Sequence, residues 1–157
     1  MKRSALLILL IFCLFCGCTR HGAASAQPPQ LAAVQDRTVF IRTSLTQMTA
    51  AWHYDGGSDF VLAEPASLDG LKISCTNGDC SASLGDTAVP FPQSAAFAQI
   101  DKAFRTLLHG SVIPVLTQEG WKYDGSLYGF TAIQDPSDGR LRTMHFPKSG
   151  ITVTFEP

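Results

Sequence analysis

Cysteine is the residue type whose chemistry is easiest to place in this 157-residue chain, which contains five of them. Cys18 follows Gly17 just after the apolar run 6–15, and Lys2 and Arg3 stand before that run. A charged start and a short apolar stretch are typical of a bacterial export signal, and the run is too short to span a bilayer. The Gly-Cys ending is typical of lipoprotein signals, in which the cysteine thiol is acylated. We therefore predict a signal peptide over residues 1–17, lipidation at Cys18 and a place on the extracytoplasmic face of the cell membrane.

A second cleavage site remains open. The sequence Ala24-Ser25-Ala26 fits the small-x-small pattern of the ordinary signal peptidase, which would release a soluble protein beginning at Gln27. We favour Cys18 because it lies directly behind the apolar run. Residues 18–36 contain Ala, Gly and Pro and are predicted to form a flexible tether, and 37–157 a single domain.

Cys75 and Cys80 are the two cysteines of the predicted domain. Asn77-Gly78 between them is the strongest hairpin signal in the chain, because a type I′ turn needs positive φ at both central residues. Folding about this turn pairs the cysteines across the two strands in a non-hydrogen-bonded position, where a disulfide fits. A metal site is the less favoured alternative, since neither a histidine nor a second cysteine pair lies nearby in sequence.

The other residue types with catalytic potential do not form a motif. The four histidines have no second metal ligand three or four residues further on: His21, His53, His109 and His145. His109 precedes Gly110, where a cation near a helix end is favourable, and the aspartates near 55–59 and 135–138 fit turns. The sequence contains neither a Gly-x-Ser-x-Gly elbow nor a phosphate loop. We predict a protein that is not an enzyme and needs no cofactor or metal.

The charge balance argues against nucleic acid as a partner. The chain has 12 basic and 13 acidic residues, a net charge of −1. Without Lys2 and Arg3 the mature chain is more acidic still, and it has no basic run.

The apolar pattern predicts strands on both sides of one helix. Strands are expected over 38–54 (one bent strand or two), 59–64, 125–134, 140–146 and 151–155, in addition to the hairpin. Pro90 and Pro92 break the sheet, and a helix follows between Ser94 and Gly110. Its apolar residues recur at helical spacing: Phe97, Ile100, Phe104, Leu107 and Leu108. Short turns between strands imply an antiparallel meander, hence an α+β domain with the helix packed on one sheet face.

Three features together resemble a known family. These are Pro65-x-x-Leu68-x-Gly70-Leu71, the Asn-Gly hairpin with its Pro-containing entry to one amphipathic helix, and the ending Val153-Thr154-Phe155. They are similar to uncharacterised lipoproteins of Gram-positive bacteria, which resemble the lipoprotein-localisation-factor fold. The resemblance implies a curved antiparallel sheet, an incomplete barrel, with the helix on its concave face. It also implies space for acyl chains between sheet and helix, bordered by Phe97, Ile100, Phe104, Leu107 and Phe130.

Two functional hypotheses lead from this sequence. The first is a membrane-anchored, non-enzymatic lipoprotein that binds a lipid or another apolar ligand between sheet and helix. The alternative is a module that holds another envelope protein and takes no small-molecule ligand. The large aromatic residues near turns either pack on the sheet or form an exposed recognition patch. They are Trp52, Tyr54, Trp121, Tyr123 and Tyr128.

Overall fold

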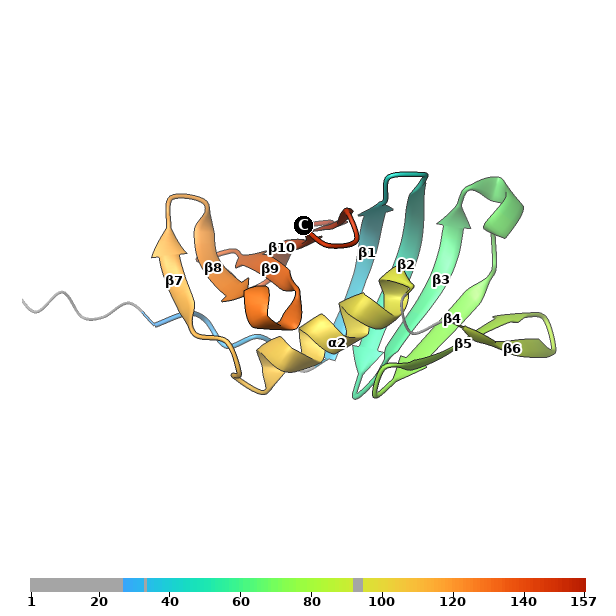
Figure 1. Ribbon diagram of the computed structural model, residues 1–157, viewed down its shortest axis with the longest axis horizontal. Helices are drawn as coiled ribbons and strands as arrows, with labels where there is room; N and C mark the ends of the chain where they lie inside the picture. Colours follow the sequence, from blue (N-terminus) through green and yellow to red (C-terminus); the bar gives the residue numbers. More distant parts are fainter. Residues whose placement is uncertain (1–26, 33, 92–94) are drawn as a thin grey trace, which may run out of the picture.

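A computed structural model describes residues 27–32, 34–91 and 95–157, which form one curved sheet with one α-helix lying across it (Figure 1). The first half of the sheet is β1 (Val34–Arg42), β2 (Gln47–Asp55), β3 (Ser58–Glu64), β4 (Lys72–Thr76), β5 (Asp79–Leu84) and β6 (Thr87–Phe91). The helix α2 (Ala96–Leu108) follows, and then β7 (Pro114–Thr117), β8 (Gly120–Gly125), β9 (Phe130–Gln134), β10 (Leu141–Phe146) and β11 (Ile151–Phe155). Two 3₁₀ turns, η1 (Ala66–Leu68) and η2 (Ser126–Tyr128), connect neighbouring strands.

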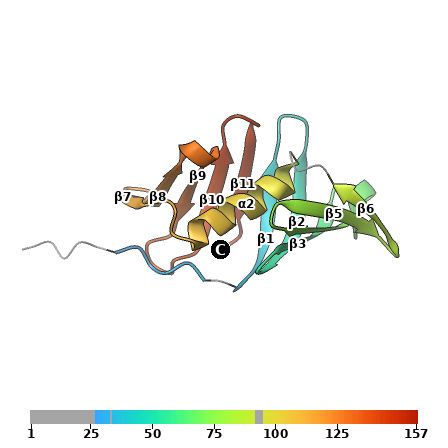
Figure 2. The ribbon, with the colours of Figure 1, turned by 60° about the horizontal axis from the view of Figure 1, so that its bottom comes forward.

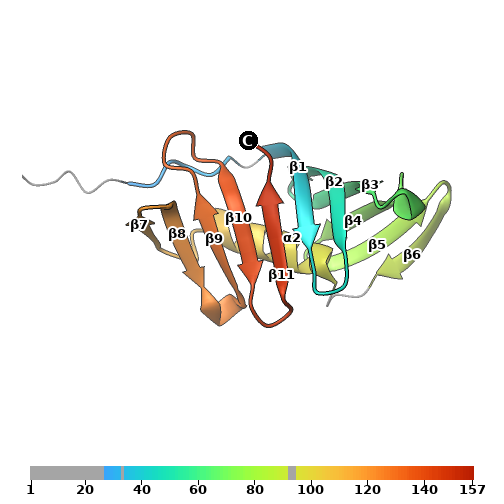
Figure 3. The same ribbon diagram turned by 90° about the horizontal axis from the view of Figure 1, so that it is seen from above.

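All strand pairs of the described residues are antiparallel, and the order is β6-β5-β4-β3-β2-β1-β11-β10-β9-β8-β7. Two meanders therefore meet where β1 pairs with β11, and the sheet stays open because β6 and β7 form its two edges. The helix runs over the concave face between the strands of the two meanders (Figures 1 and 2), while the view from above shows the strands side by side (Figure 3). The predicted fold class, an incompletely closed antiparallel sheet with a helix on its concave face, is confirmed.

Alternation along the strands gives the sheet one buried and one exposed face. In β2, Met48, Ala50, Trp52 and Tyr54 are buried, while the residues between them are more exposed. The same period of two holds in β3, β4, β9 and β11. The concave face is thus apolar and is covered by the apolar stripe of α2.

The hairpin forms in the predicted register. Asn77 and Gly78 have φ of 55° and 85°, Thr76 pairs with Asp79, and Cys75 pairs with Cys80. The two sulfur atoms are bonded, with the Cα atoms 4.1 Å apart. The strand assignment and the cysteine pairing at this turn are therefore both confirmed by the structure.

The structure corrects one expected boundary and decides one open alternative in the first part of the chain. β1 begins at Val34, inside the segment 18–36 predicted as a tether. The carbonyl of Pro29 accepts a hydrogen bond from the buried Gln134 amide, so part of that segment lies against the domain. The segment 38–54 is two strands, because a turn at 43–46 separates them.

The regions around the helix also differ from expectation. Pro90 lies within β6, which is tolerated because β6 is an edge strand. The segments that form β7 and β8 were not predicted as strands. Ser94, the predicted N-cap, lies outside the described residues, and Ala95 precedes the helix as its N-cap; Gly110, with φ of 66°, follows the C-cap residue as predicted.

Candidate functional site

A buried carboxylate on α2 joins the helix to the first half of the sheet by a hydrogen bond. The Asp101 carboxylate is fully buried on the inner face of the helix. It accepts a 2.9 Å hydrogen bond from Ser58 Oγ at the start of β3 and a 2.7 Å bond from Arg105 one turn further along the helix. A buried carboxylate is tolerated only when such partners compensate its lost hydration. Asp101 therefore connects α2 to β3 through its hydrogen bond with Ser58.

Arg105 connects the same helical turn to the β4–β5 hairpin. Its guanidinium also donates to the side-chain oxygen of Asn77 at the β4–β5 turn. Burial raises the pKa of Tyr54, whose hydroxyl lies in the field of Arg105 and Asp101, so this tyrosine is neutral at ordinary pH. The side chains of one helical turn thus reach two separate strand ends.

All five residues predicted to line a ligand space are buried, and four of them lie on α2. Phe97, Ile100, Phe104 and Leu107 are buried under α2. Phe104 meets Trp52 and Tyr54 with ring centroids 5.0 and 4.6 Å apart, in edge-on geometry. Phe97 meets Phe60 in the same way at 4.9 Å. Interdigitated rings at these distances fill the space between helix and sheet on this side.

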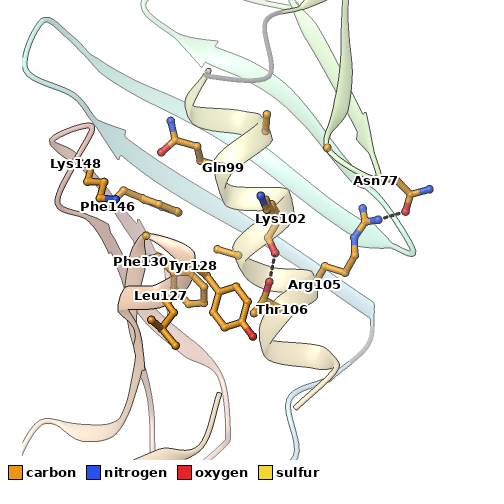
Figure 4. Close-up of a pocket in the computed structure, with 14 residues that line it drawn as sticks. Asn77, Gln99, Lys102, Arg105, Thr106, Leu127, Tyr128, Phe130, Phe146 and Lys148 are labelled. Atoms are coloured by element: carbon orange, nitrogen blue, oxygen red, sulfur yellow. Dashed lines mark hydrogen bonds between the residues drawn. The ribbon is translucent and has the colours of Figure 1, made fainter. Parts of the chain in front are cut away.

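A groove lies instead where α2 faces the second half of the sheet (Figure 4). Its volume is about 490 Å³, within the range of about 300–1,000 Å³ typical of small-molecule sites. The helix supplies the floor, η2 and the ends of β9 and β10 supply one wall, and the β4–β5 turn supplies the other. The lining residues are Asn77, Gly78, Ala98, Gln99, Lys102, Ala103, Arg105, Thr106, Leu127, Tyr128, Gly129, Phe130, Phe146 and Lys148. Phe130 is the predicted ligand residue that the structure places at this groove.

Apolar and basic side chains together line the groove. Leu127 (96 % exposed) and Tyr128 supply exposed apolar surface from η2, and the buried rings of Phe130 and Phe146 line the groove from β9 and β10. Figure 4 shows Leu127 and Tyr128 on the opposite side of the helix from Arg105 and Asn77. The basic residues come from α2 and from the β10–β11 turn, and no Asp, Glu, His or Cys is among the described lining residues. Such a surface offers apolar contact and positive charge.

A hydrogen bond also joins α2 to the turn after β10. Ser149 Oγ, in the turn after β10, donates to Gln99 Oε1 at 2.8 Å. This bond links α2 to the second half of the sheet, whereas the hydrogen bond from Ser58 to Asp101 links it to the first. The helix therefore bridges the two meanders, and the groove lies beside that bridge.

The remaining candidate residues lie apart from the groove. Cys18 and His21 fall outside the described residues. His53 lies on the exposed face of β2, where its Nδ1 is 2.8 Å from Asp36 Oδ1, and that contact raises the pKa of His53. Of the large aromatic residues, Trp52, Tyr54, Trp121 and Tyr123 are buried, whereas Tyr128 is exposed at the groove. The described part of the chain contains no cluster of three potential metal ligands and no helix with the length and hydropathy of a membrane span.

Sequence reasoning missed the residues that define this site. Asp101 has a local signal, since it stands in the apolar stripe one turn after Phe97, where a carboxylate is unexpected and needs a partner. Arg105 at the i+4 position is that partner. Lys102, Leu127 and Lys148 have no comparable signal, because the fold alone brings them to one groove.

Comparison with known proteins yields a resemblance among solved structures only. No protein-family profile matches the chain, and no curated protein matches it either. A solved structure of a LolA superfamily protein from Nitrosomonas europaea aligns with a TM-score of 0.41 and 13% sequence identity, over 84% of this chain and 87% of that one. This degree of similarity does not assign the chain to a family. The Gram-positive lipoprotein family indicated by the turn motifs stays a prediction.

Proposed function

We propose that this protein is a non-enzymatic binding protein of the cell envelope, anchored by lipid at Cys18, that holds an apolar or amphiphilic ligand in the groove beside α2. The observation that carries the proposal is the groove itself, with the apolar side chains of η2, β9 and β10 along one wall. Most ligand pockets combine a largely apolar lining with a few polar groups that fix orientation. The ligand lies over the outer side of the helix, and not in the core between helix and sheet where the aromatic rings pack.

Exposed apolar surface supports this assignment. Leu127 at the tip of η2 is almost fully exposed, and Tyr128 beside it is exposed as well. An isolated exposed leucine has no special meaning, but one that lies beside an exposed tyrosine at the border of a groove gains contact area when a ligand enters. Covering about 100 Å² of such surface is worth about 2.5 kcal/mol.

Photolabelling with a neutral apolar probe tests the proposal. The full chain, purified in non-ionic micelles, is irradiated with a diazirine derivative of dodecanol, and the labelled peptides are mapped. We expect labels in η2 and the adjoining start of β9. Thr106→Trp fills the groove from the helix, and its hydroxyl bonds only to the carbonyl of Lys102 in the same helix, so this variant keeps the fold and loses the labels.

The matched control places the same ring elsewhere. Thr154 is exposed on the other face of β11, and Thr154→Trp should leave the labelling pattern unchanged. Labels spread evenly over the surface, or labels in η2 that persist in Thr106→Trp, would show that the groove does not bind the probe.

Lipid anchoring is the second part of the proposal and rests on the leader sequence. Cys18→Ala should leave an unprocessed precursor or a released protein, where the parent chain partitions into detergent with an acylated N-terminus. A mature N-terminus at Gln27 in the parent chain would contradict anchoring and favour ordinary secretion.

An interaction module is the second candidate, and one observation favours it. The edge strand β7 and the residue before it expose three large apolar side chains, Ile113, Val115 and Leu116. An unpaired strand edge can accept a strand from another chain. Crosslinking in membranes followed by peptide mapping separates the candidates, since a partner of this kind is captured at β7 and not at η2.

A further inference from the structure

The basic residues of the groove show an electrostatic pattern that differs from the chain as a whole. The complete sequence carries a net charge of −1, yet the groove is lined by Lys102, Arg105 and Lys148 without a carboxylate among its described lining residues. Arg105 is neutralised from below by Asp101. Lys102 and Lys148 take part in none of the salt bridges formed among the described residues.

The local sequence leaves the charge of Lys102 without compensation. Its neighbours at three and four residues along the helix are Ala98, Gln99, Arg105 and Thr106, so there is no acidic side chain on that face of α2. The carboxylate of Asp101, next to it in sequence, is on the inner side of the helix and is already bonded to Ser58 and Arg105. Lys102 therefore presents positive charge to the groove from its floor.

Lys148 brings a second charge from a different element. It lies in the turn after β10, two residues beyond Phe146, which contributes a ring to the same groove (Figure 4). The groove thus joins apolar side chains with two uncompensated lysines within one cavity of about 490 Å³. A neutral apolar ligand would leave both charges unused, and a cationic ligand would be repelled.

From this arrangement we infer that the ligand of the groove is an anionic amphiphile, whose carboxylate or phosphate head lies between Lys102 and Lys148 and whose single chain lies along the exposed Leu127 and Tyr128. This inference rests on the proposed function, because it assigns a ligand class to the same groove. The head pairs with lysines that retain access to water, so it enters without full loss of hydration. The chain covers the exposed apolar wall.

Competition against the dodecanol photoprobe tests the head group at constant chain length. The competitors are dodecanoate, dodecyl phosphate, dodecanol and dodecyltrimethylammonium, each added to the full chain in non-ionic micelles. We expect dodecanoate or dodecyl phosphate to displace the probe at about one tenth of the dodecanol concentration, and dodecyltrimethylammonium to be the weakest. The relative strength of the two anions separates a carboxylate source from a phosphate source. Raising the salt concentration should weaken both anions and leave dodecanol unchanged.

Charge-neutral variants test the residues. Lys102→Met with Lys148→Met keeps chain length and helix propensity, and should reduce the advantage of the anions over dodecanol about tenfold. Lys122 lies exposed on β8, between the buried Trp121 and Tyr123, and is absent from the groove. Lys122→Met is therefore the matched control and should change nothing. Arg105 is left intact because it holds the helix in place.

Each outcome has a separate meaning. If the photoprobe does not label η2, the proposed function fails. If it labels η2 but the four competitors act equally, or the lysine variants leave the anion advantage intact, the groove binds apolar ligands and the inference about the anionic head is overturned. Equal displacement by inorganic phosphate at the same concentration also overturns it, because a site for a bare anion needs no chain.

Discussion

The sequence leaves open whether Phe104 packs in a filled core or borders a space for a ligand. Truncating its side chain distinguishes the two. Phe104 is 0 % exposed, and its ring touches Trp52 and Tyr54 edge-on. Burying a phenylalanine removes about 150 Å² from water, worth about 4 kcal/mol at about 25 cal/mol per Å². Alanine keeps a small part of that, while the cavity left behind and the two lost aromatic contacts add to the loss. We expect Phe104→Ala to lower the free energy of unfolding by about 4–5 kcal/mol.

Urea denaturation followed by tryptophan fluorescence measures this loss, since Trp52 reports directly on the site. Because small domains have total stabilities of about 5–15 kcal/mol, Phe104→Leu serves as a milder variant and should lose about 1.5 kcal/mol. Leu45, 94% exposed in the β1–β2 turn, gives the control, and Leu45→Ala should stay within about 0.5 kcal/mol of the parent chain.

Labelling of the groove provides the second readout. Phe104 is absent from the groove lining, so Phe104→Leu should leave photolabelling of η2 unchanged. A loss below about 1 kcal/mol in Phe104→Ala, together with altered labelling, would refute the reasoning and place the ligand between helix and sheet.

Three further outcomes are expected. Replacing both hairpin cysteines by alanine should cost about 2 kcal/mol, because the closed loop is short, and peptide mapping without reductant should show the two joined. The pKa of His53, followed by NMR, should lie above its ordinary value and return toward it in Asp36→Asn. The contact of protonated His53 with Asp36 therefore stabilises the folded state below the ordinary pKa of histidine, and this stabilisation is lost as the pH rises through the folded-state pKa. Gly139 has φ of 75°, and a Cβ there would lie 2.7 Å from a proline side chain of the N-terminal segment. At Gly150 φ is 64° and the space around a Cβ is open, so Gly150→Ala should lose only the backbone cost of about 1–2 kcal/mol. Gly139→Ala should lose more than that in urea denaturation, because the contact with the proline adds to the backbone cost.

Local signals predicted the parts of this fold that depend on neighbours in sequence. The Asn77-Gly78 turn determines its own register, because two positive φ values admit few residue types, and the disulfide follows from that register. The stripe from Phe97 to Leu107 likewise identifies the buried side of the helix.

Other elements depend on contacts between distant residues. β1 meets β11 across more than a hundred residues of sequence, and a meander pattern does not say which strands close the centre of the sheet. β8 does carry an alternating signal in Trp121 and Tyr123, but it is short and lies between glycines. The groove is the extreme case, since Lys102 and Lys148 share it through the fold alone.

The position of the groove follows from how the helix is held. The elements that pack closest to α2 are β3, β4 and β5, and the buried Asp101 binds it to β3 while Arg105 binds it to the hairpin turn. On the other side, a hydrogen bond between Ser149 and Gln99 joins exposed or half-buried residues. A helix held tightly on one side and lightly on the other leaves its open space on the second side, where the apolar wall of η2 stands. Asp101, in the apolar stripe, does not line the groove, because it holds the helix on the side that packs against β3.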